Sequence, residues 1–141
     1  MTESERGAPL PIAIVFDGGS LNNPGHGYGS YQISVDHDAP RIERLDFGSP
    51  VTNNEAEYLA LINALEDAVA TLERLGIDPS HSTVLVQGDS QLVLKQIGGE
   101  WKVRQSHLLP LRDRALALVS RLGTVSLQWH GRLNSVRILG H

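Results

Sequence analysis

The sequence predicts an α/β fold in which helices flank a five-stranded mixed sheet. Strand patterns at residues 12–16, 28–35 and 41–47 come before any helical pattern, and strand patterns at 83–88 and 125–129 follow helical ones. Three consecutive strands favour an antiparallel meander, whereas a strand that returns after a helix can pair in parallel. The order strand, strand, strand, helix, strand, helix, helix, strand therefore predicts a mixed sheet with helices on its faces.

The first strand is predicted from five consecutive apolar residues, Ile-Ala-Ile-Val-Phe at 12–16. Such a run, preceded by Pro11, is typical of a central strand that is buried on both faces. We expect the strand to end at Asp17, because Asp-Gly is a common turn signal. A functional interpretation is also open, since a carboxylate at the end of a buried strand is costly to desolvate without a positive partner. Gly18 and Gly19 would let a ligand come close to it.

The longest helix is predicted to begin at Thr52 or Asn53 and to end at Gly76. Asn53 and Asn54 are natural helix caps, and Glu55 lies in the first turn, where the helix dipole favours an anion. We assign Glu55 this structural role. The apolar residues at helical spacing are Ala56, Leu59, Ala60, Ile62, Ala64, Leu65, Ala68 and Leu72.

The second half of the chain repeats the pattern of a buried strand followed by a carboxylate. The strand at 83–88 ends on Asp89, and a helix that starts near Ser90 follows it. Another helix is predicted over 108–122, where Pro110 is tolerable only in the first turn. No element is assigned after residue 129.

Composition limits the class of protein. The chain has 141 residues, of which 40% are hydrophobic, so we expect a single domain over 1–141 with residues 1–9 as a loose lead-in. It has no cysteine, which excludes disulfides, thiolate metal sites and cysteine nucleophiles. No apolar run approaches the ~20 residues that a membrane helix needs, and no signal-peptide pattern is present. We expect a cytoplasmic monomer without a membrane segment.

Charge is divided unevenly along the chain. Residues 1–88 hold four Lys/Arg and thirteen Asp/Glu, which gives −9, whereas residues 89–141 hold eight and three, which gives +5. An acidic half that gathers metal and a basic half that meets phosphate would suit a nucleic-acid enzyme. Chance clustering on solvated faces explains the same numbers.

Asp17, Glu57 and Asp89 form the candidate metal-binding set. Two strands that each end in Asp, with a Glu in the main helix, are a recurrent way to hold divalent cations. Mg²⁺ prefers oxygen ligands and keeps several waters, so a few converging carboxylates suffice. Two such ions can activate a water and stabilise the leaving oxygen of a phosphodiester. The sequence alone does not show that the three side chains converge.

Three stretches together resemble successive signatures of type 1 ribonuclease H. They are residues 16–20 (Phe-Asp-Gly-Gly-Ser) with 23–25 (Asn-Pro-Gly), 52–57 (Thr-Asn-Asn-Glu-Ala-Glu), and 88–93 (Gly-Asp-Ser-Gln-Leu-Val). The resemblance implies the ribonuclease H-like fold, with the first three strands antiparallel. It also implies a metal-dependent endonuclease that cleaves the RNA strand of an RNA–DNA hybrid and leaves 5′-phosphomonoesters. Asp17, Glu57 and Asp89 would then be ligands of Mg²⁺ or Mn²⁺, with two ions expected when substrate is bound.

The resemblance also assigns substrate contacts. Asn23, Asn53 and Gln91 match family positions that contact the hybrid in its minor groove, where 2′-hydroxyls offer partners to amides. Thr52 matches a position that helps bind a DNA-strand phosphate. Their neighbours Asn54 and Ser90 complete the predicted substrate-binding set. The structural alternatives are a helix cap for Asn53 and a solvated first-turn position for Gln91.

The chain departs from the family pattern near its end. Family members usually carry a fourth acid at the start of a last helix, but this chain has no Asp or Glu after Asp113. We predict that Asn134 replaces that acid as a catalytic residue and metal ligand, since its amide oxygen can ligate a hard cation. In an alternative register Asn134 is the family's Asn and Ile138 takes the acid's place.

His130 lies near the position of a mobile, proton-moving His in the family, so it is a candidate catalytic residue, and an exposed strand-end His is the alternative. The segment at 98–107 is too short for the family's basic protrusion, so weak hybrid affinity is expected.

The competing hypotheses to an active ribonuclease are a catalytically impaired hybrid-binding protein and another nuclease of the same fold, such as a DNA resolvase or transposase core.

Overall fold

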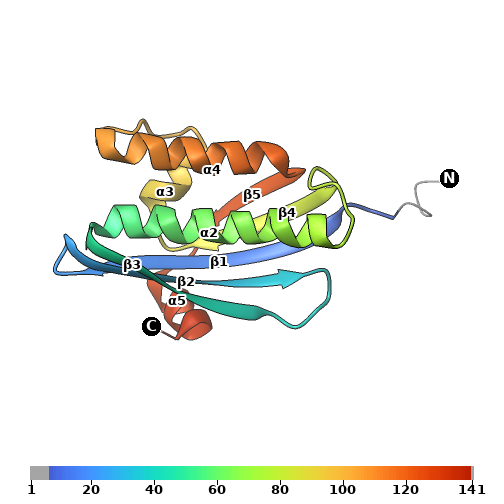
Figure 1. Cartoon of the computed structure of the whole chain (residues 1–141), viewed down its shortest axis with the longest axis horizontal. Coiled ribbons are helices and arrows are strands. Elements are labelled where there is room, and N and C mark those ends of the chain that lie inside the picture. The colour runs from blue at the N-terminus through green and yellow to red at the C-terminus, as the bar shows by residue number, and fades with distance from the viewer. Residues whose placement is uncertain (1–6, 141) are drawn as a thin grey trace.

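Strand β1 lies at the centre of a five-stranded sheet in the computed structural model, which describes residues 7–140 (Figure 1). The order across the sheet is β3-β2-β1-β4-β5. The β1–β2 and β2–β3 pairs are antiparallel, and the β1–β4 and β4–β5 pairs are parallel, which confirms the predicted α/β fold class and mixed sheet. The strands are β1 (Leu10–Leu21), β2 (Gly25–Val35), β3 (Arg41–Val51), β4 (Ser82–Gly88) and β5 (Thr124–Trp129).

The expected end of the first strand at Asp17 is wrong. β1 continues to Leu21, because Gly18 and Gly19 keep pairing with β2 in the antiparallel register. The parallel pairing with β4 does end there, since its last partners are Phe16 and Gly88. Asp17 therefore lies inside a strand, at the point where one of its two neighbouring strands stops.

The long helix is α2 (Asn53–Arg74), and Thr52 is its N-cap. The Thr52 hydroxyl accepts from the Glu55 backbone N–H at 3.1 Å, and the Glu55 carboxylate accepts from the Thr52 N–H at 2.9 Å. This reciprocal capping box confirms the structural role of Glu55. The expectation that Asn53 and Asn54 cap the helix is wrong, because they already lie within its first turn.

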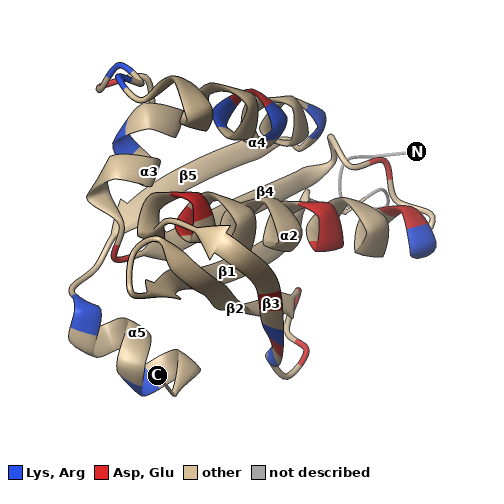
Figure 2. Ribbon diagram, turned by 60° about the vertical axis from the view of Figure 1, so that its left-hand side comes forward, with Lys and Arg blue, Asp and Glu red and all other residues tan. Residues whose placement is uncertain are grey.

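The remaining helices cover both faces of the sheet. In Figures 1 and 2, α3 and α4 lie on the same side as α2, and α5 lies on the other side of β1 and β2. The last helix was not predicted, because its few apolar residues do not share one face: Leu133 is 85% exposed, whereas Leu139 is buried. These elements are α3 (Gln91–Ile97), the 3₁₀ turn η1 (Ser106–Leu108), α4 (Leu109–Arg121) and α5 (Arg132–Leu139).

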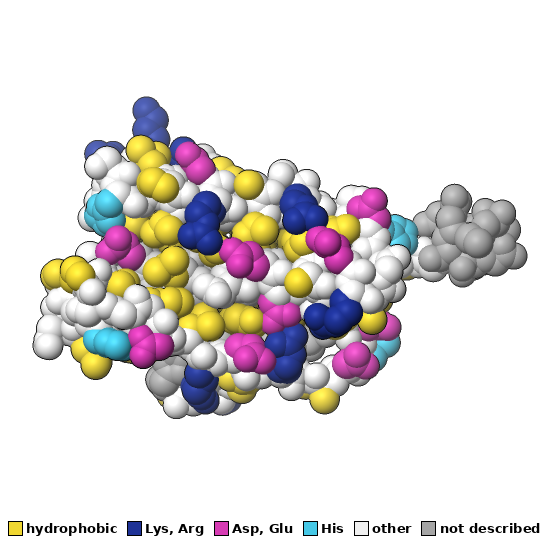
Figure 3. Space-filling view, viewed as in Figure 1, with side chains coloured by type: hydrophobic (Ala, Val, Ile, Leu, Met, Phe, Trp, Pro, Cys, Tyr) yellow, Lys and Arg dark blue, Asp and Glu magenta, His cyan; other side chains and the backbone are white. Residues whose placement is uncertain are grey.

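Small residues bring α2 close to the sheet. Ala56, Ala60, Ala64 and Ala68 follow one another at four-residue spacing and are all fully buried. Since residues four apart lie on one face of a helix, they form a narrow strip that allows close packing on β1. On the outer side of α2, ion pairs to α4 join Arg114 to Glu66 and Arg121 to Glu73. Figure 3 shows basic and acidic side chains close together on this face of the molecule.

In the described part of the chain, no helix is long and apolar enough to cross a membrane. The predicted N-terminal lead-in at 1–9 lies mostly outside the described residues, which begin at Gly7.

Candidate active site

The carboxylates of Asp17 and Asp89 lie at neighbouring positions on the edge of the sheet. Phe16 and Gly88 are the last parallel partners of β1 and β4, and the two Asp residues follow them directly. Asp17 is 4% exposed as a whole residue, and the side chain of Asp89 is 8% exposed. Both acids are therefore held almost out of water, side by side, by the register of two buried strands.

Gly18 brings Glu57 to the same place. A Cβ atom on Gly18 would lie 2.7 Å from the Glu57 backbone N and would also clash with the Ala56 carbonyl. Only a residue without a side chain lets the first turns of α2 cross β1 this closely. Glu57, on the helix, consequently faces the carboxylates that come from the strands.

Burial and mutual repulsion make two of the acids hard to ionise. Burial, followed by the charge of Asp89, raises the pKa of Asp17 to about 6, although Arg132 works in the opposite direction. Burial also raises the pKa of Glu57 to about 7; a hydrogen bond from Ser90 lowers it, and the charges of Asp89 and Asp17 raise it further. Raised values of this kind at converging carboxylates are typical of functional sites.

One carboxylate oxygen of Asp89 receives no hydrogen bond within residues 7–140. Its Oδ2 atom is buried and has no hydrogen-bond partner among the described residues. The guanidinium of Arg132, at the start of α5, approaches it to 3.8 Å. On the backbone side, the indole N–H of Trp129 donates to the Asp89 carbonyl at 3.1 Å. The residue is thus fixed by its backbone, while one carboxylate oxygen still lacks a donor.

This set of donors fits a divalent cation. Hard oxygen ligands, repulsion between them and an unsatisfied buried carboxylate oxygen are what a bound Mg²⁺ or Mn²⁺ would compensate. Within residues 7–140, however, no three His, Asp or Glu side chains already hold metal-binding geometry. The carboxylates would have to turn toward a shared ion from their present orientations.

Asn134 and His130 occupy different surroundings from the three acids. The Asn134 amide oxygen accepts from Arg137 at 3.1 Å, one turn further along α5. The His130 ring is buried, and its Nε2 lies 2.8 Å from the Ser135 hydroxyl. The backbone N–H of His130 donates to the Gly88 carbonyl at 2.9 Å, next to Asp89. The exposed strand-end His considered above is therefore wrong, and His130 links β4 to α5.

The predicted substrate-binding amides gather around the start of α2. The Asn23 amide oxygen accepts from the Asn53 N–H at 2.9 Å, and the Asn53 amide oxygen accepts from the Ser20 N–H at 2.7 Å. The Asn54 amide reaches Gln105 at 3.5 Å. We call the cavity of about 290 Å³ beside them the amide cavity; it is lined by Asn23, Thr52, Asn53, Asn54, Gln105 and His107.

Ser90 and Gln91 begin α3. The Ser90 hydroxyl caps the helix by accepting from the Val93 N–H at 3.2 Å, and it also donates to Glu57. Gln91 is exposed at the first position of the helix, where it is accessible to a ligand. Gln105, His107, Trp129 and Arg132 were not selected from the sequence. They reach the site through the packing of η1, β5 and α5, which no local motif marks.

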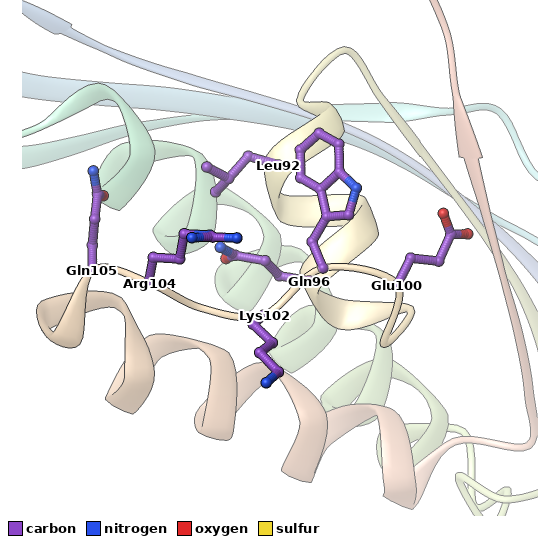
Figure 4. A pocket seen from close by; sticks show the side chains of 7 residues that line it. Leu92, Gln96, Glu100, Lys102, Arg104 and Gln105 are labelled. Carbon is purple, nitrogen blue, oxygen red and sulfur yellow. The ribbon is translucent and has the colours of Figure 1, made fainter.

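A larger cavity of about 520 Å³ lies beside α3 (Figure 4). In the close-up, the side chain of Arg104 reaches toward Leu92 and Gln96, whereas Lys102 and Glu100 point away from them. The ring of Trp101 stacks under Lys95, whose amine lies 5.2 Å from the ring centroid. Part of this cavity is formed by the segment at 98–107, where we expected the family's basic protrusion to be missing. The structure has no helix between α3 and η1.

Known proteins are similar to this chain in sequence and in fold. Residues 16–136 match the family model described as reverse transcriptase-like. The chain is 39% identical over 121 residues, 85% of its length, to a bifunctional protein of Mycobacterium tuberculosis, and 36% identical over 109 residues, 77% of its length, to a ribonuclease HI of Halobacterium salinarum. It spans 31% and 51% of the lengths of these two relatives.

Solved structures agree with these matches. The chain covers 90% of an RNase H1 from Halobacterium salinarum, with a TM-score of 0.76 and 31% identity. It covers 95% of the N-terminal RNase H domain of the Mycobacterium tuberculosis protein, with a TM-score of 0.77 and 34% identity. It also covers 89% of LC11-RNase H1, solved in complex with an RNA/DNA hybrid, with a TM-score of 0.78 and 29% identity.

The strand order of the sheet, the helix α2 that crosses β1, and the similar solved structures together define a ribonuclease H-like domain. With its relatives, the chain belongs to the type 1 ribonuclease H family, which confirms the resemblance.

Proposed function

We propose that this chain is an endoribonuclease that hydrolyses the RNA strand of RNA–DNA hybrids and leaves 5′-phosphomonoesters. The observation that carries the proposal is electrostatic: the charge of Asp89 raises the pKa of Asp17, and the charges of Asp89 and Asp17 raise the pKa of Glu57. Asp89 Oδ2 is also buried without a hydrogen-bond partner among residues 7–140. The ribonuclease HI relative and the homologue solved with a hybrid support the same activity.

Asp17, Glu57 and Asp89 are the proposed ligands of Mg²⁺ or Mn²⁺, with two ions expected in the presence of substrate. Such ions, when bound, supply a nucleophilic hydroxide and stabilise the leaving oxygen. The protein's own part would be to hold the backbones of these three residues close together, so that their partly buried carboxylates can turn toward a shared ion. Trp129 contributes by fixing the backbone of Asp89, and Ser90 by donating to Glu57.

The amide cavity is the proposed place for the hybrid. Asn23 and Asn53, which line the cavity, and Gln91, which begins α3 outside its lining, would meet minor-groove edges and 2′-hydroxyls. Thr52 would help bind a phosphate. The Asn23 and Asn53 amide oxygens are used within the protein, so their NH₂ groups are the donors left for nucleic acid. Arg104 and Trp101, at the larger cavity, offer a cation and an aromatic face to the same ligand.

The assay that tests the proposal compares a labelled RNA–DNA hybrid with duplex RNA and duplex DNA, with and without Mg²⁺ or Mn²⁺. We expect metal-dependent cuts in the RNA strand of the hybrid alone. Tight binding without cleavage in either metal would favour the impaired hybrid-binding protein. Cleavage of duplex DNA would favour a resolvase-like or transposase-like nuclease. Cytoplasmic localisation and a monomeric state stay predictions from the sequence.

Asn134 as the fourth metal ligand also stays a prediction. Its oxygen would have to exchange Arg137 for the ion, because the two are hydrogen-bonded on α5. A metal titration of cleavage by Asn134→Ala decides this point. A higher metal requirement than that of the parent supports ligation, and an unchanged titration supports the register that places Ile138 at the acid's position.

A further inference from the structure

Helix α5 brings a cation, and no carboxylate, to the three acids. Arg132 is the first residue of α5, and its Nη1 atom lies 3.8 Å from Asp89 Oδ2. The remaining cation of the helix, Arg137, is bound to Asn134. Figure 2 shows Lys and Arg positions on α5 and no Asp or Glu. The end of the chain therefore adds positive charge to a site built of acids.

The charge of Arg132 acts on the whole cluster. Besides its contact with Asp89, it lowers the pKa of both Asp17 and Glu57 against the effect of burial. Within residues 7–140, Asp89 is the one acid with which Arg132 forms an ion pair. The guanidinium is thus the local counter-charge for three carboxylates that otherwise repel one another.

We propose that Arg132 is the resident counter-cation of the Asp17–Glu57–Asp89 cluster, and that a divalent cation must displace it from Asp89 in order to bind. Arg132 then sets the metal affinity of the protein. The inference rests on the proposed function in so far as the metal is the one that hydrolysis would use.

The geometry of the pair suits displacement. At 3.8 Å the contact is longer than a hydrogen bond, and Asp89 Oδ2 has no hydrogen-bond partner in the described part of the chain. The Arg132 side chain is 69% exposed, so it can move into solvent without breaking the packing of α5. Asp89 is anchored by Trp129 and stays in place when Arg132 leaves.

Calorimetric titration of Mn²⁺ into the intact protein at pH 8, without nucleic acid, tests the proposal. Arg132→Gln and Arg132→Met remove the charge, Arg132→Lys keeps it, and Arg121→Gln makes the same change of net charge at the surface pair with Glu73. We expect the two charge-removing variants at Arg132 to bind Mn²⁺ about three- to ten-fold more tightly, as an exposed charge near a partly buried site allows. Arg132→Lys and Arg121→Gln should bind like the parent.

Equal affinity in all variants, or weaker binding after loss of the Arg132 charge, would overturn the proposal, as would an absence of Mn²⁺ binding at millimolar concentration. A purely structural role for Arg132 would appear instead as a lower melting temperature with unchanged Mn²⁺ affinity.

The result of this titration can be distinguished from a failure of the proposed function. A protein that binds metal in this Arg132-dependent way and cleaves no hybrid refutes only the function, and one that cleaves hybrids with an Arg132-independent affinity refutes only this inference.

Discussion

Asp17 and Asp67 are two poorly exposed carboxylates of the same domain in opposite electrostatic situations. Asp67, on α2, accepts from Tyr31 at 2.6 Å, from both terminal nitrogens of Arg41 at 2.9 Å, and from Thr71 at 3.0 Å. Burial opposes its ionisation, but these donors outweigh burial and hold its pKa below the usual value. At Asp17, burial and the charge of Asp89 prevail and raise the pKa to about 6.

The difference shows how a structural carboxylate is distinguished from a functional one. Every strong interaction of Asp67 is made within the protein, so the group ties α2 to β2 and β3 and has no need of a ligand. In the other cluster, the pKa values of Asp17 and Glu57 are raised, and Asp89 Oδ2 has no hydrogen-bond partner in the described part of the chain. Such a site loses stability in the free protein and recovers it on binding a cation.

The largest effect that the comparison predicts is on catalysis. Asp17→Asn keeps the shape of the side chain and the acceptor for the Gly18 N–H, but it removes the charge that would hold the metal. We expect hybrid cleavage to fall by more than about 100-fold, since even the partners that orient metal ligands are worth 10–100-fold. Gel assays at saturating Mg²⁺ measure this, and activity close to that of the parent would contradict the metal assignment.

The second prediction concerns stability at the satisfied carboxylate. Asp67→Asn removes the carboxylate that accepts from Tyr31, Arg41 and Thr71, and it leaves Arg41 paired with Glu43. It should cost about 1.5–3 kcal/mol of unfolding free energy at pH 7. Because the folded pKa of Asp67 lies below its ordinary value of 3.8, this contribution is complete above that pH and is lost as the pH falls through the folded value. Urea unfolding at pH 7 and pH 3 measures the difference.

A matched control for this variant is Asp113→Asn, whose pair with Arg112 is exposed. It should change the unfolding free energy by less than about 0.5 kcal/mol. Cleavage per folded molecule should be unchanged in both variants. Loss of activity in folded Asp67→Asn would show that Asp67 is coupled to the Asp17 cluster, and its role would then not be purely structural.

The third prediction is that removing the charge of Asp17 stabilises the fold, whereas removing that of Asp67 destabilises it. Since the folded pKa of Asp17 is about 6 and its ordinary value is 3.8, ionisation of Asp17 destabilises the fold as the pH rises between these values, and fully above them. Asp17→Asn should therefore stabilise the metal-free protein at pH 8 by about 1–2 kcal/mol and leave it unchanged below pH 4. Thermal melts in EDTA at the two pH values test this. Destabilisation at pH 8 would mean that the carboxylate has partners stronger than its repulsion.

Much of the site was predictable because its parts are local in sequence. Asp17 and Asp89 each follow a buried apolar strand, and parallel pairing of those strands places them together. Arg132 was not predictable, because its position depends on how α5 docks. That docking uses a hydrogen bond from Arg44 to the Leu139 carbonyl, between residues that are 95 positions apart. Long-range packing of this kind leaves no periodic pattern.

The limits of the strands and helices also divide into those that local sequence predicts and those that depend on distant residues. The antiparallel meander and the long helix were predictable from apolar spacing, but the end of β1 was not. The Asp-Gly pair at Asp17 has the composition of a turn, and only the presence of β2 alongside shows that Gly18 stays in a strand. α5 was missed because a short helix with exposed Leu133 has no clear apolar face.

The smallest predicted effect separates substrate binding from the metal site. Asn23→Ala removes an amide from the cavity at the start of α2 without touching any of the three acids. We expect KM for the hybrid to rise about three- to ten-fold, which corresponds to one or two lost hydrogen bonds, with kcat and the metal dependence unchanged. Asn63→Ala is the matched control, because that amide bonds only to the Leu59 carbonyl of its own helix among the described residues. It should leave KM unchanged. A shifted Mg²⁺ optimum with unchanged KM in Asn23→Ala would instead assign Asn23 to the metal site, and the two regions would then act as one.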